Sequence, residues 1–207
     1  LPSCRFAAHV TRMPCATAQQ RSPARECFAN ANYRNQWFSD ALSQWGYEME
    51  TLILGWYILV ETNSPFLVGV VGALRYGGTL LSPLLGVYAD RLPMVPLLFA
   101  IRLVFAIVAA GVAAAAWFEV LVPAHAFIAA ATAGLLRAPE MVMRHTLLGA
   151  IVPSRLLVNA IGYSRVTMDT SKIVGAFAGA GAMATLGIDY AYLIVTSMYG
   201  ASIGFTL

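Results

Sequence analysis

The chain has 207 residues, of which 59% are hydrophobic and 11% are charged, and its mean hydropathy is +0.69. A soluble domain carries about 25% charged residues, and a chain of this length has too much surface for so apolar a composition. An ordinary water-soluble fold is therefore excluded. The formal net charge is +3, but no basic stripe interleaved with aromatic residues follows, so no nucleic acid is expected as a partner.

The N-terminal 31 residues form a polar stretch. They are rich in Pro, Ala, Ser and Arg, and they lack the apolar core that a signal peptide carries. We expect residues 1–31 to be a disordered tail or sequence outside the true start. All three cysteines lie here (Cys4, Cys15 and Cys27), without a CxxC pair or a histidine at metal-ligand spacing. They predict free thiols and no metal site.

Six apolar blocks follow, separated by short polar turns. A bilayer core about 30 Å thick requires roughly 20 apolar residues in a helix, and in lipid a helix satisfies its own backbone hydrogen bonds. The predicted spans are residues 38–60, 66–88, 94–117, 120–136, 158–186 and 190–207. A longer polar link, residues 137–155, joins the fourth and fifth spans. The fold class predicted is all-α, a polytopic membrane helical bundle.

The charges of the predicted loops indicate the orientation. Five arginines precede the first span, Arg91 follows the second, and Arg144 and Arg155 lie in the link after the fourth. The alternate turns hold acidic residues without Lys or Arg: Glu61, Glu119 and Asp189. Since cytoplasmic loops are enriched in Lys and Arg, we expect a cytoplasmic N-terminus.

Several charged side chains lie inside the predicted spans: Glu48, Glu50, Arg75, Arg102, Arg165, Asp169 and Lys172. A charge at mid-bilayer costs about 2.5–3.5 kcal/mol on insertion scales, so it normally faces a partner or a water-filled cavity. The functional interpretation is a polar central cavity, in which a carboxylate exchanges a proton and a cation binds an anionic substrate or acts as counter-ion. The alternatives are packing salt bridges, or Arg165 and Lys172 extending to the cytoplasmic interface.

Three of these charges share one helix. Spacings of four and three residues place Arg165, Asp169 and Lys172 on one face of the fifth span. Two cations beside one anion leave a net positive charge, and Glu48 or Glu50 of the first span is the expected partner.

The second half of the fifth span carries Gly175 and Gly179, four residues apart. Small residues at this spacing let helix backbones approach closely. They predict helix packing, either static or permitting two helices to slide.

The segment Gly86-Val-Tyr-Ala-Asp90-Arg91 resembles the turn between the second and third spans of major facilitator superfamily transporters. In that family the turn acts as a latch on the cytoplasmic gate, which implies a gate motif of Gly86, Asp90 and Arg91. Asp90 is suited to cap a helix N-terminus. The sequence departs from the family pattern at Pro93, and at the two residues after it, where a glycine and a basic pair are usual.

Two further stretches resemble the branch of that family that includes siderophore and macrolide exporters. The first span contributes Asn32, Tyr33, Arg34, Trp37, Gly46, Gly55, Trp56, Ser64 and Pro65. The link and fifth span contribute Pro139, Val152, Pro153, Asn159, Ala160, Lys172, Gly175 and Gly179. The resemblance covers residues 32–207.

The resemblance implies a transporter of about twelve spans, of which this chain is the N-terminal half, built from 3+3 inverted repeats with substrate bound between the halves. It also implies proton-coupled efflux of small amphipathic molecules from a bacterial cytoplasm across the inner membrane. The candidate proton-coupling residues are Glu48, Glu50 and Asp169, and the candidate cavity residues are Arg75, Arg102, Arg165 and Lys172. The expected partners are the lipid bilayer, the substrate, protons and a second six-span half.

Two other classes of membrane protein are the alternatives. A non-transporting receptor or assembly subunit would have a dry core with its intramembrane charges fully paired. An intramembrane enzyme is not expected, because the predicted spans contain no cysteine and only His125, and no phosphate-binding loop or other cofactor motif is present. The chain begins at Leu1 rather than Met and stops at Leu207 inside an apolar run, so we expect a fragment.

Overall fold

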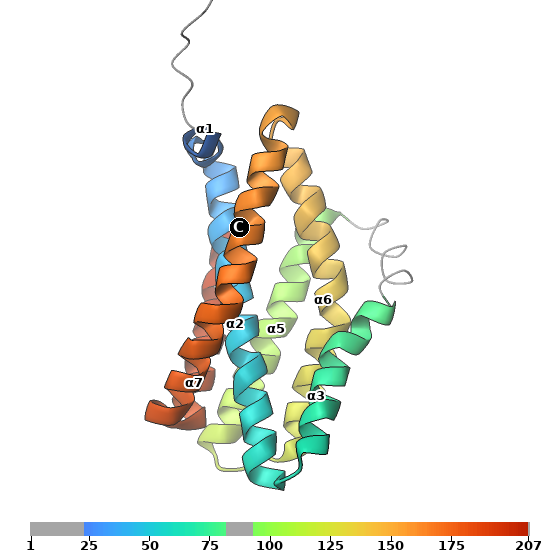
Figure 1. Ribbon diagram of the computed structural model, residues 1–207, viewed down its shortest axis with the longest axis vertical. Helices are drawn as coiled ribbons and strands as arrows, with labels where there is room; N and C mark the ends of the chain where they lie inside the picture. The colour runs from blue at the N-terminus through green and yellow to red at the C-terminus, as the bar shows by residue number, and fades with distance from the viewer. Residues whose placement is uncertain (1–22, 82–92, 207) are drawn as a thin grey trace, which may run out of the picture.

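The computed structural model describes residues 23–81 and 93–206, and within these ranges the chain is helical, without a strand. The elements are α1 (Pro23–Ala29), α2 (Ala31–Thr62), α3 (Pro65–Gly77), a short 3-10 helix η1 (Gly78–Leu81), α5 (Met94–Trp117), α6 (Pro123–Ile151) and α7 (Ser154–Thr206). Figure 1 shows the long helices side by side in one bundle, with α3 along α6 and α1 at one end. The all-α prediction is confirmed.

Helix α2 contains the predicted first span, and many of the polar residues of that span face inward. Asn30 caps the helix by accepting a hydrogen bond from the backbone N–H of Asn32 at 3.1 Å, and Asn63 ends it in the left-handed region with a φ of 48°. Six polar side chains of α2 are buried: Gln36, Ser39, Asp40, Ser43, Gln44 and Glu50. The polar half of this helix is thus an internal face of the bundle.

Helices α3 and α6 cross at two glycines. A Cβ atom on Gly78 would collide with the backbone carbonyl of Gly134, and one on Gly134 would collide with the carbonyl of Leu74. The α-helix gives way to the 3-10 turn η1 at this crossing. The described part of the predicted second span therefore ends in a close backbone contact, and residues 82–88 of that span lie outside the described residues.

Helix α6 corrects the predicted boundary of the fourth span. The span was expected to end at residue 136 in a polar link, whereas α6 continues unbroken through Pro139 to Ile151. The polar residues of this stretch form ion pairs inside the bundle, so they are an internal helical face rather than a loop. Pro123 suits the first turn of the helix, and Pro153 follows its end.

Helix α7 consists of two helical segments joined at Gly187. This glycine has φ 85° and ψ 174°, a conformation available essentially to glycine alone. The predicted turn after residue 186 is therefore confirmed as a break. Segment 154–186 packs Gly175 and Gly179 on α2. Segment 188–206 reaches α5, where the Tyr199 ring stacks on Phe105 with centroids 5.6 Å apart.

Part of the predicted tail is folded. Helix α1 lies within residues 1–31, and Cys27 is 2% exposed. Cys27 packs in a small apolar cluster with Val152 and Leu156, and the Phe28 ring meets Trp37 edge-on. These apolar contacts explain the order that a composition rich in Pro, Ser and Arg did not predict.

The outside of the bundle is strongly apolar. Large exposed side chains include Phe66, Leu80, Val158 and Phe177, each more than three-quarters exposed. Among the described helices, α5, α6 and α7 are each long and apolar enough to cross a membrane, judged by length and composition. Helix α3 is apolar but shorter. An apolar exterior around a polar interior suggests association with a membrane.

Candidate functional site

Asp40 lies at the centre of a group of buried charges on α2, α5 and α6. Its Oδ1 atom pairs with the guanidinium of Arg102 and lies 3.4 Å from Nε of Arg144. Gln36 donates to the same oxygen at 2.8 Å. All four side chains are buried. Two arginine guanidinium groups therefore share one carboxylate oxygen.

Glu140 extends this group along α6. It has no exposed surface and accepts hydrogen bonds from Arg144 and Arg137 at 3.1 Å each and from Ser43 at 3.2 Å. We call Asp40, Arg102, Arg137, Glu140 and Arg144 the five-charge network. It holds three cations and two anions, so its formal charge is positive.

Gln44 links the five-charge network to Glu48. Its Oε1 atom accepts a hydrogen bond from Arg137, and its Nε2 atom donates to Oε1 of Glu48 at 2.8 Å. Glu48 is partly exposed, and a Cβ atom on Gly175 would lie 3.0 Å from the Cβ atom of Glu48. Glu48 therefore stands where the buried charges meet the accessible side of the α2–α7 contact.

Glu50 and Arg75 form a second buried group. Tyr199 donates its hydroxyl to Oε2 of Glu50 at 3.0 Å, and Nη1 of Arg75 lies 3.7 Å from the same oxygen. Arg75 also donates from Nη2 to the backbone carbonyl of Tyr47 at 3.1 Å. The Glu50–Arg75 pair is thus looser than the ion pairs of the five-charge network.

Serine side chains join α2 to the second segment of α7. Ser39 donates to the backbone carbonyl of Ser202 at 2.5 Å, and Ser202 donates to the carbonyl of Ser39 at 2.9 Å. Arg102 donates to the Ser39 hydroxyl as well. The five-charge network is therefore tied to α7 without any charge on that helix.

The predicted triad of the fifth span lies elsewhere. Arg165 and Lys172 do share Asp169, at 3.4 and 3.1 Å, which confirms their common face. All three side chains are more than half exposed, outside the bundle interior formed by the described residues. The expected pairing with Glu48 or Glu50 is wrong, because Gln44 bonds to Glu48 and Arg75 pairs with Glu50.

The remaining predicted residues fall into two sets. Gly175 and Gly179 lie where α7 meets α2, since a Cβ on Gly179 would lie 3.0 Å from the backbone carbonyl of Met49. This placement agrees with the close packing predicted for them. The gate residues Gly86, Asp90 and Arg91 lie outside the described residues.

Sequence reasoning missed four members of the five-charge network, Asp40, Arg137, Glu140 and Arg144. Asp40 lies in the predicted first span but is not among the candidate residues, and the other three lie in the predicted polar link. The sequence pattern that indicates the last three is their spacing. Arg137, Glu140 and Arg144 are separated by three and four residues, which places them on one helical face.

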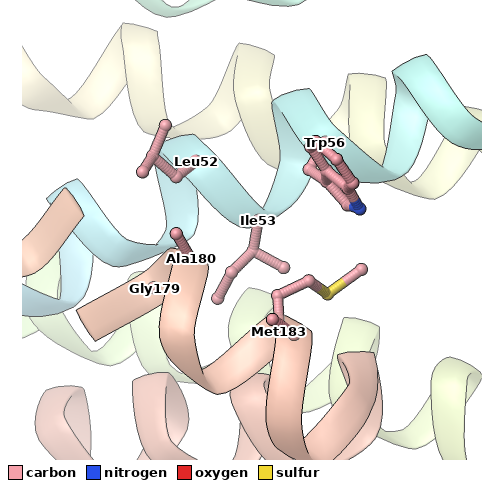
Figure 2. Close-up of a pocket in the computed structure, with 7 residues that line it drawn as sticks. Leu52, Ile53, Trp56, Gly179, Ala180 and Met183 are labelled. Carbon is pink, nitrogen blue, oxygen red and sulfur yellow. The ribbon is translucent and has the colours of Figure 1, made fainter. Parts of the chain in front are cut away.

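An apolar cavity of about 280 Å³ lies between α2 and α7. It is lined by Leu52, Ile53, Trp56, Gly179, Ala180, Met183 and Ala184, most of which Figure 2 labels. Figure 2 shows Ile53 and Met183 pointing toward one another across the gap, with the Trp56 ring beside them. Leu52, one of the lining residues, is one helical turn from Glu48 along α2. A cavity of this kind suits an apolar group of a small molecule.

Within the described residues no group of histidine, cysteine or acidic side chains is arranged to hold a metal ion. The carboxylates of the two buried groups are instead matched by arginines.

Comparison with protein-family models, curated proteins and solved structures gives no match for this chain. The fold and the buried charges therefore carry the functional argument, and the resemblance described above remains an expectation from short motifs.

Proposed function

We propose that this chain is the N-terminal six-span half of a secondary transporter of the major facilitator type, built as 3+3 inverted repeats. It would move small amphipathic molecules out of a bacterial cytoplasm by alternating access, in exchange for protons. A second six-span half and the lipid bilayer complete the working protein.

One observation carries this proposal: ionisable side chains are buried inside a bundle with an apolar exterior. Asp40, Glu50, Arg75, Arg102, Glu140 and Arg144 are all less than a tenth exposed. Ionisable residues within membrane helices are rare and expensive, and they typically mark ion or substrate pathways. Static packing would be served as well by apolar side chains, since replacing a buried ion pair by apolar residues is often neutral or stabilising.

Glu50 is the carboxylate best placed to carry the proton. Asp40 and Glu140 each contact two arginines. Glu50 has one arginine at 3.7 Å and a neutral hydroxyl donor, Tyr199. Less charge compensation makes protonation easier. Glu48, the other candidate on this helix, is partly exposed and bonded to Gln44.

The orientation rests on charges at the two ends of the bundle. At one end Arg155 is 72% exposed and pairs with Glu26 of α1 at 2.9 Å. At the other end the Trp117 ring meets Tyr190, and the acidic residues Glu119 and Asp189 adjoin these rings. Arg144 no longer counts as a loop charge, because it is buried. The remaining asymmetry supports a cytoplasmic N-terminus.

The apolar cavity between α2 and α7 supports an amphipathic substrate. Its walls suit an apolar group. The exposed triad of Arg165, Asp169 and Lys172 precedes the wall residues along the same helix, α7. A charged face along an otherwise apolar helix needs water or protein against it rather than lipid. The second half of the transporter would enclose this face.

The test is proton-linked transport in lipid vesicles by this chain together with its second six-span half, read with a fluorescent amphipathic dye and an imposed pH gradient. We expect dye movement that follows the gradient, and loss of that dependence in Glu50→Gln. Glu61→Gln, the same change at an exposed residue near the end of α2, is the control. Gradient-driven transport that survives in Glu50→Gln, and also in Glu48→Gln, would place the carrier elsewhere.

A non-transporting membrane protein is the second candidate, and the pairing of buried charges favours it. Each buried carboxylate named above has an arginine within 4 Å, as a dry structural core requires. The two candidates differ in water access. Cysteines introduced singly at positions 48, 75 and 172, in a chain whose native cysteines are replaced by serine, would react with a water-soluble thiol reagent in a transporter. Uniform protection would favour the structural role.

A further inference from the structure

The aromatic ring of Tyr47 is shared by two cations. The guanidinium carbon of Arg75 lies 4.1 Å from the ring centroid, and that of Arg137 lies 4.3 Å from it. Arg75 comes from α3 and Arg137 from α6, while Tyr47 belongs to α2 and is 8% exposed. The ring therefore joins the Glu50–Arg75 pair to the five-charge network.

Arg75 is held more closely by Tyr47 than by Glu50. Its Nη2 atom donates to the Tyr47 carbonyl at 3.1 Å, and its charge lies over the Tyr47 ring. Its Nη1 atom is 3.7 Å from Glu50 and has no hydrogen-bond partner among the described residues. A separation of that length is outside hydrogen-bond range. Two of these three contacts of the Arg75 guanidinium, the hydrogen bond and the ring contact, are therefore made with Tyr47.

We propose that Tyr47 is a positioning residue that holds Arg75 away from full contact with Glu50, and thereby leaves Glu50 free to exchange its proton. The inference rests on the proposed function and names how its proton site is regulated. When Glu50 binds a proton from water, Arg75 loses its counter-charge but keeps the Tyr47 carbonyl and ring. When the proton leaves, Arg75 and the hydroxyl of Tyr199 stabilise the carboxylate.

The surroundings of Glu50 explain why the ring matters. The charged and titratable groups that face it are Arg75 from α3, Tyr192 and Tyr199 from α7, and Tyr47 from α2. Arg75 is the cation of this set. Without the ring, Arg75 is free to close on Glu50, and a close guanidinium–carboxylate pair resists protonation.

The experiment measures the protonation of Glu50 directly, by infrared titration of the full chain in lipid vesicles. The carboxylic acid band of Glu50 is identified as the one that Glu50→Gln removes. We expect Tyr47→Leu to lower the midpoint of that band by about one pH unit, the scale of a desolvated cation–π contact. Tyr47→Met keeps a bulky apolar side chain without a ring and should shift the midpoint similarly if the leucine variant folds poorly.

Two variants serve as controls. Tyr47→Phe retains both the ring and the carbonyl and should leave the midpoint unchanged. Tyr33→Leu removes a buried tyrosine from the same helix in a separate apolar cluster, and it should also leave the midpoint unchanged. An unshifted midpoint in both Tyr47→Leu and Tyr47→Met, an equal shift in either control, or absence of the band from the unmodified chain would overturn the inference.

The titration does not depend on transport. A shifted midpoint in a protein whose two halves together move no dye would reject the proposed function and leave the role of Tyr47 intact. Proton-linked dye transport with an unshifted midpoint would reject only the role of Tyr47.

Discussion

Glu140 shows how a buried carboxylate is held by its surroundings. Arg137, Arg144 and Ser43 all donate to it. Glu140→Gln would remove this counter-charge from the buried Arg144 and the partly exposed Arg137. Breaking a buried ion pair typically costs about 3–5 kcal/mol. We expect a large loss of stability, measured as thermal unfolding in detergent micelles.

The exposed triad provides the contrast. Asp169→Asn breaks two ion pairs of similar length, but exposed pairs contribute about 0–1 kcal/mol. Equal losses of thermal stability in Glu140→Gln and Asp169→Asn would show that Glu140 is not buried among the arginines as described.

The reactivity of the Cys27 thiol tests the packing of α1. Burial, followed by the nearby Glu26 carboxylate, raises the pKa of its thiol above the usual range. A raised pKa means less thiolate at neutral pH, and the thiolate is the form that reacts. With Cys4 and Cys15 replaced by serine, alkylation of Cys27 should be slow and should keep accelerating above the pH at which a free thiol levels off.

Unfolding by detergent should restore the ordinary rate and pH profile of Cys27. A rate in the folded chain equal to that of the unfolded chain would mean that α1 does not pack on α7.

At the residue scale, the sequence predicted charges inside the bundle but not their partners. Glu50, Arg75 and Arg102 were identified from their positions in apolar spans. Which carboxylate meets which arginine depends on the rotation of each helix about its axis, and Glu50 was assigned to α7 instead of α3. Rotation is decided by packing between helices, which one-dimensional periodicity does not specify.

Among the helices, the α3–α6 crossing has the least room. Gly134→Ala would place a methyl group against the carbonyl of Leu74, backbone that has no flexible end to move aside. We expect this variant to separate the two helices and lower the thermal unfolding temperature by several degrees, the scale of an overpacked contact that costs about 1–3 kcal/mol.

Gly111→Ala on α5 is the matched control for Gly134, because its Cβ would meet nothing within 4 Å. Alanine is a better helix former than glycine by roughly 1 kcal/mol, so this change should be neutral or stabilising. If both alanine variants change the unfolding temperature equally, helix propensity rather than the close contact at the crossing determines the stability of Gly134→Ala.

Helix boundaries were predicted well where turn residues are explicit. Residues 94–117 were predicted as a span and are the bounds of α5, and Gly187 breaks α7 where a turn was expected. The prediction failed where polarity was taken as evidence of a loop. Arg137, Glu140 and Arg144 are polar because they face α2, and polarity alone does not distinguish a solvated loop from an internal face.

At the scale of the whole molecule, the proposed orientation can be tested by labelling intact cells. A cysteine at position 119, in a chain without native cysteines, should react with a membrane-impermeant maleimide added outside. A cysteine at position 155 should react only after the membrane is permeabilised. Both sites are exposed in the bundle, so access to the reagent, rather than burial, decides the result. The reverse pattern would invert the proposed topology.

The all-helical bundle followed from composition, since apolar blocks of this length have few other structures available. Its inner arrangement did not. The exposed position of the Arg165, Asp169 and Lys172 triad, and the junction formed by Tyr47, arise from three-dimensional packing of four helices. The same charges would satisfy the sequence pattern in other arrangements.

The position of the acids on α2 has a consequence for biosynthesis. Asp40 and Glu50 are translated before every arginine that pairs with them, since Arg75, Arg102 and Arg144 lie on later helices. In the proposed membrane setting, α2 would leave the ribosome with both of these carboxylates before any of their arginine partners is made. The arginine partners of these two carboxylates would then be complete only when α6 emerges, so the first long helix to be made is the last to gain all of its ion pairs.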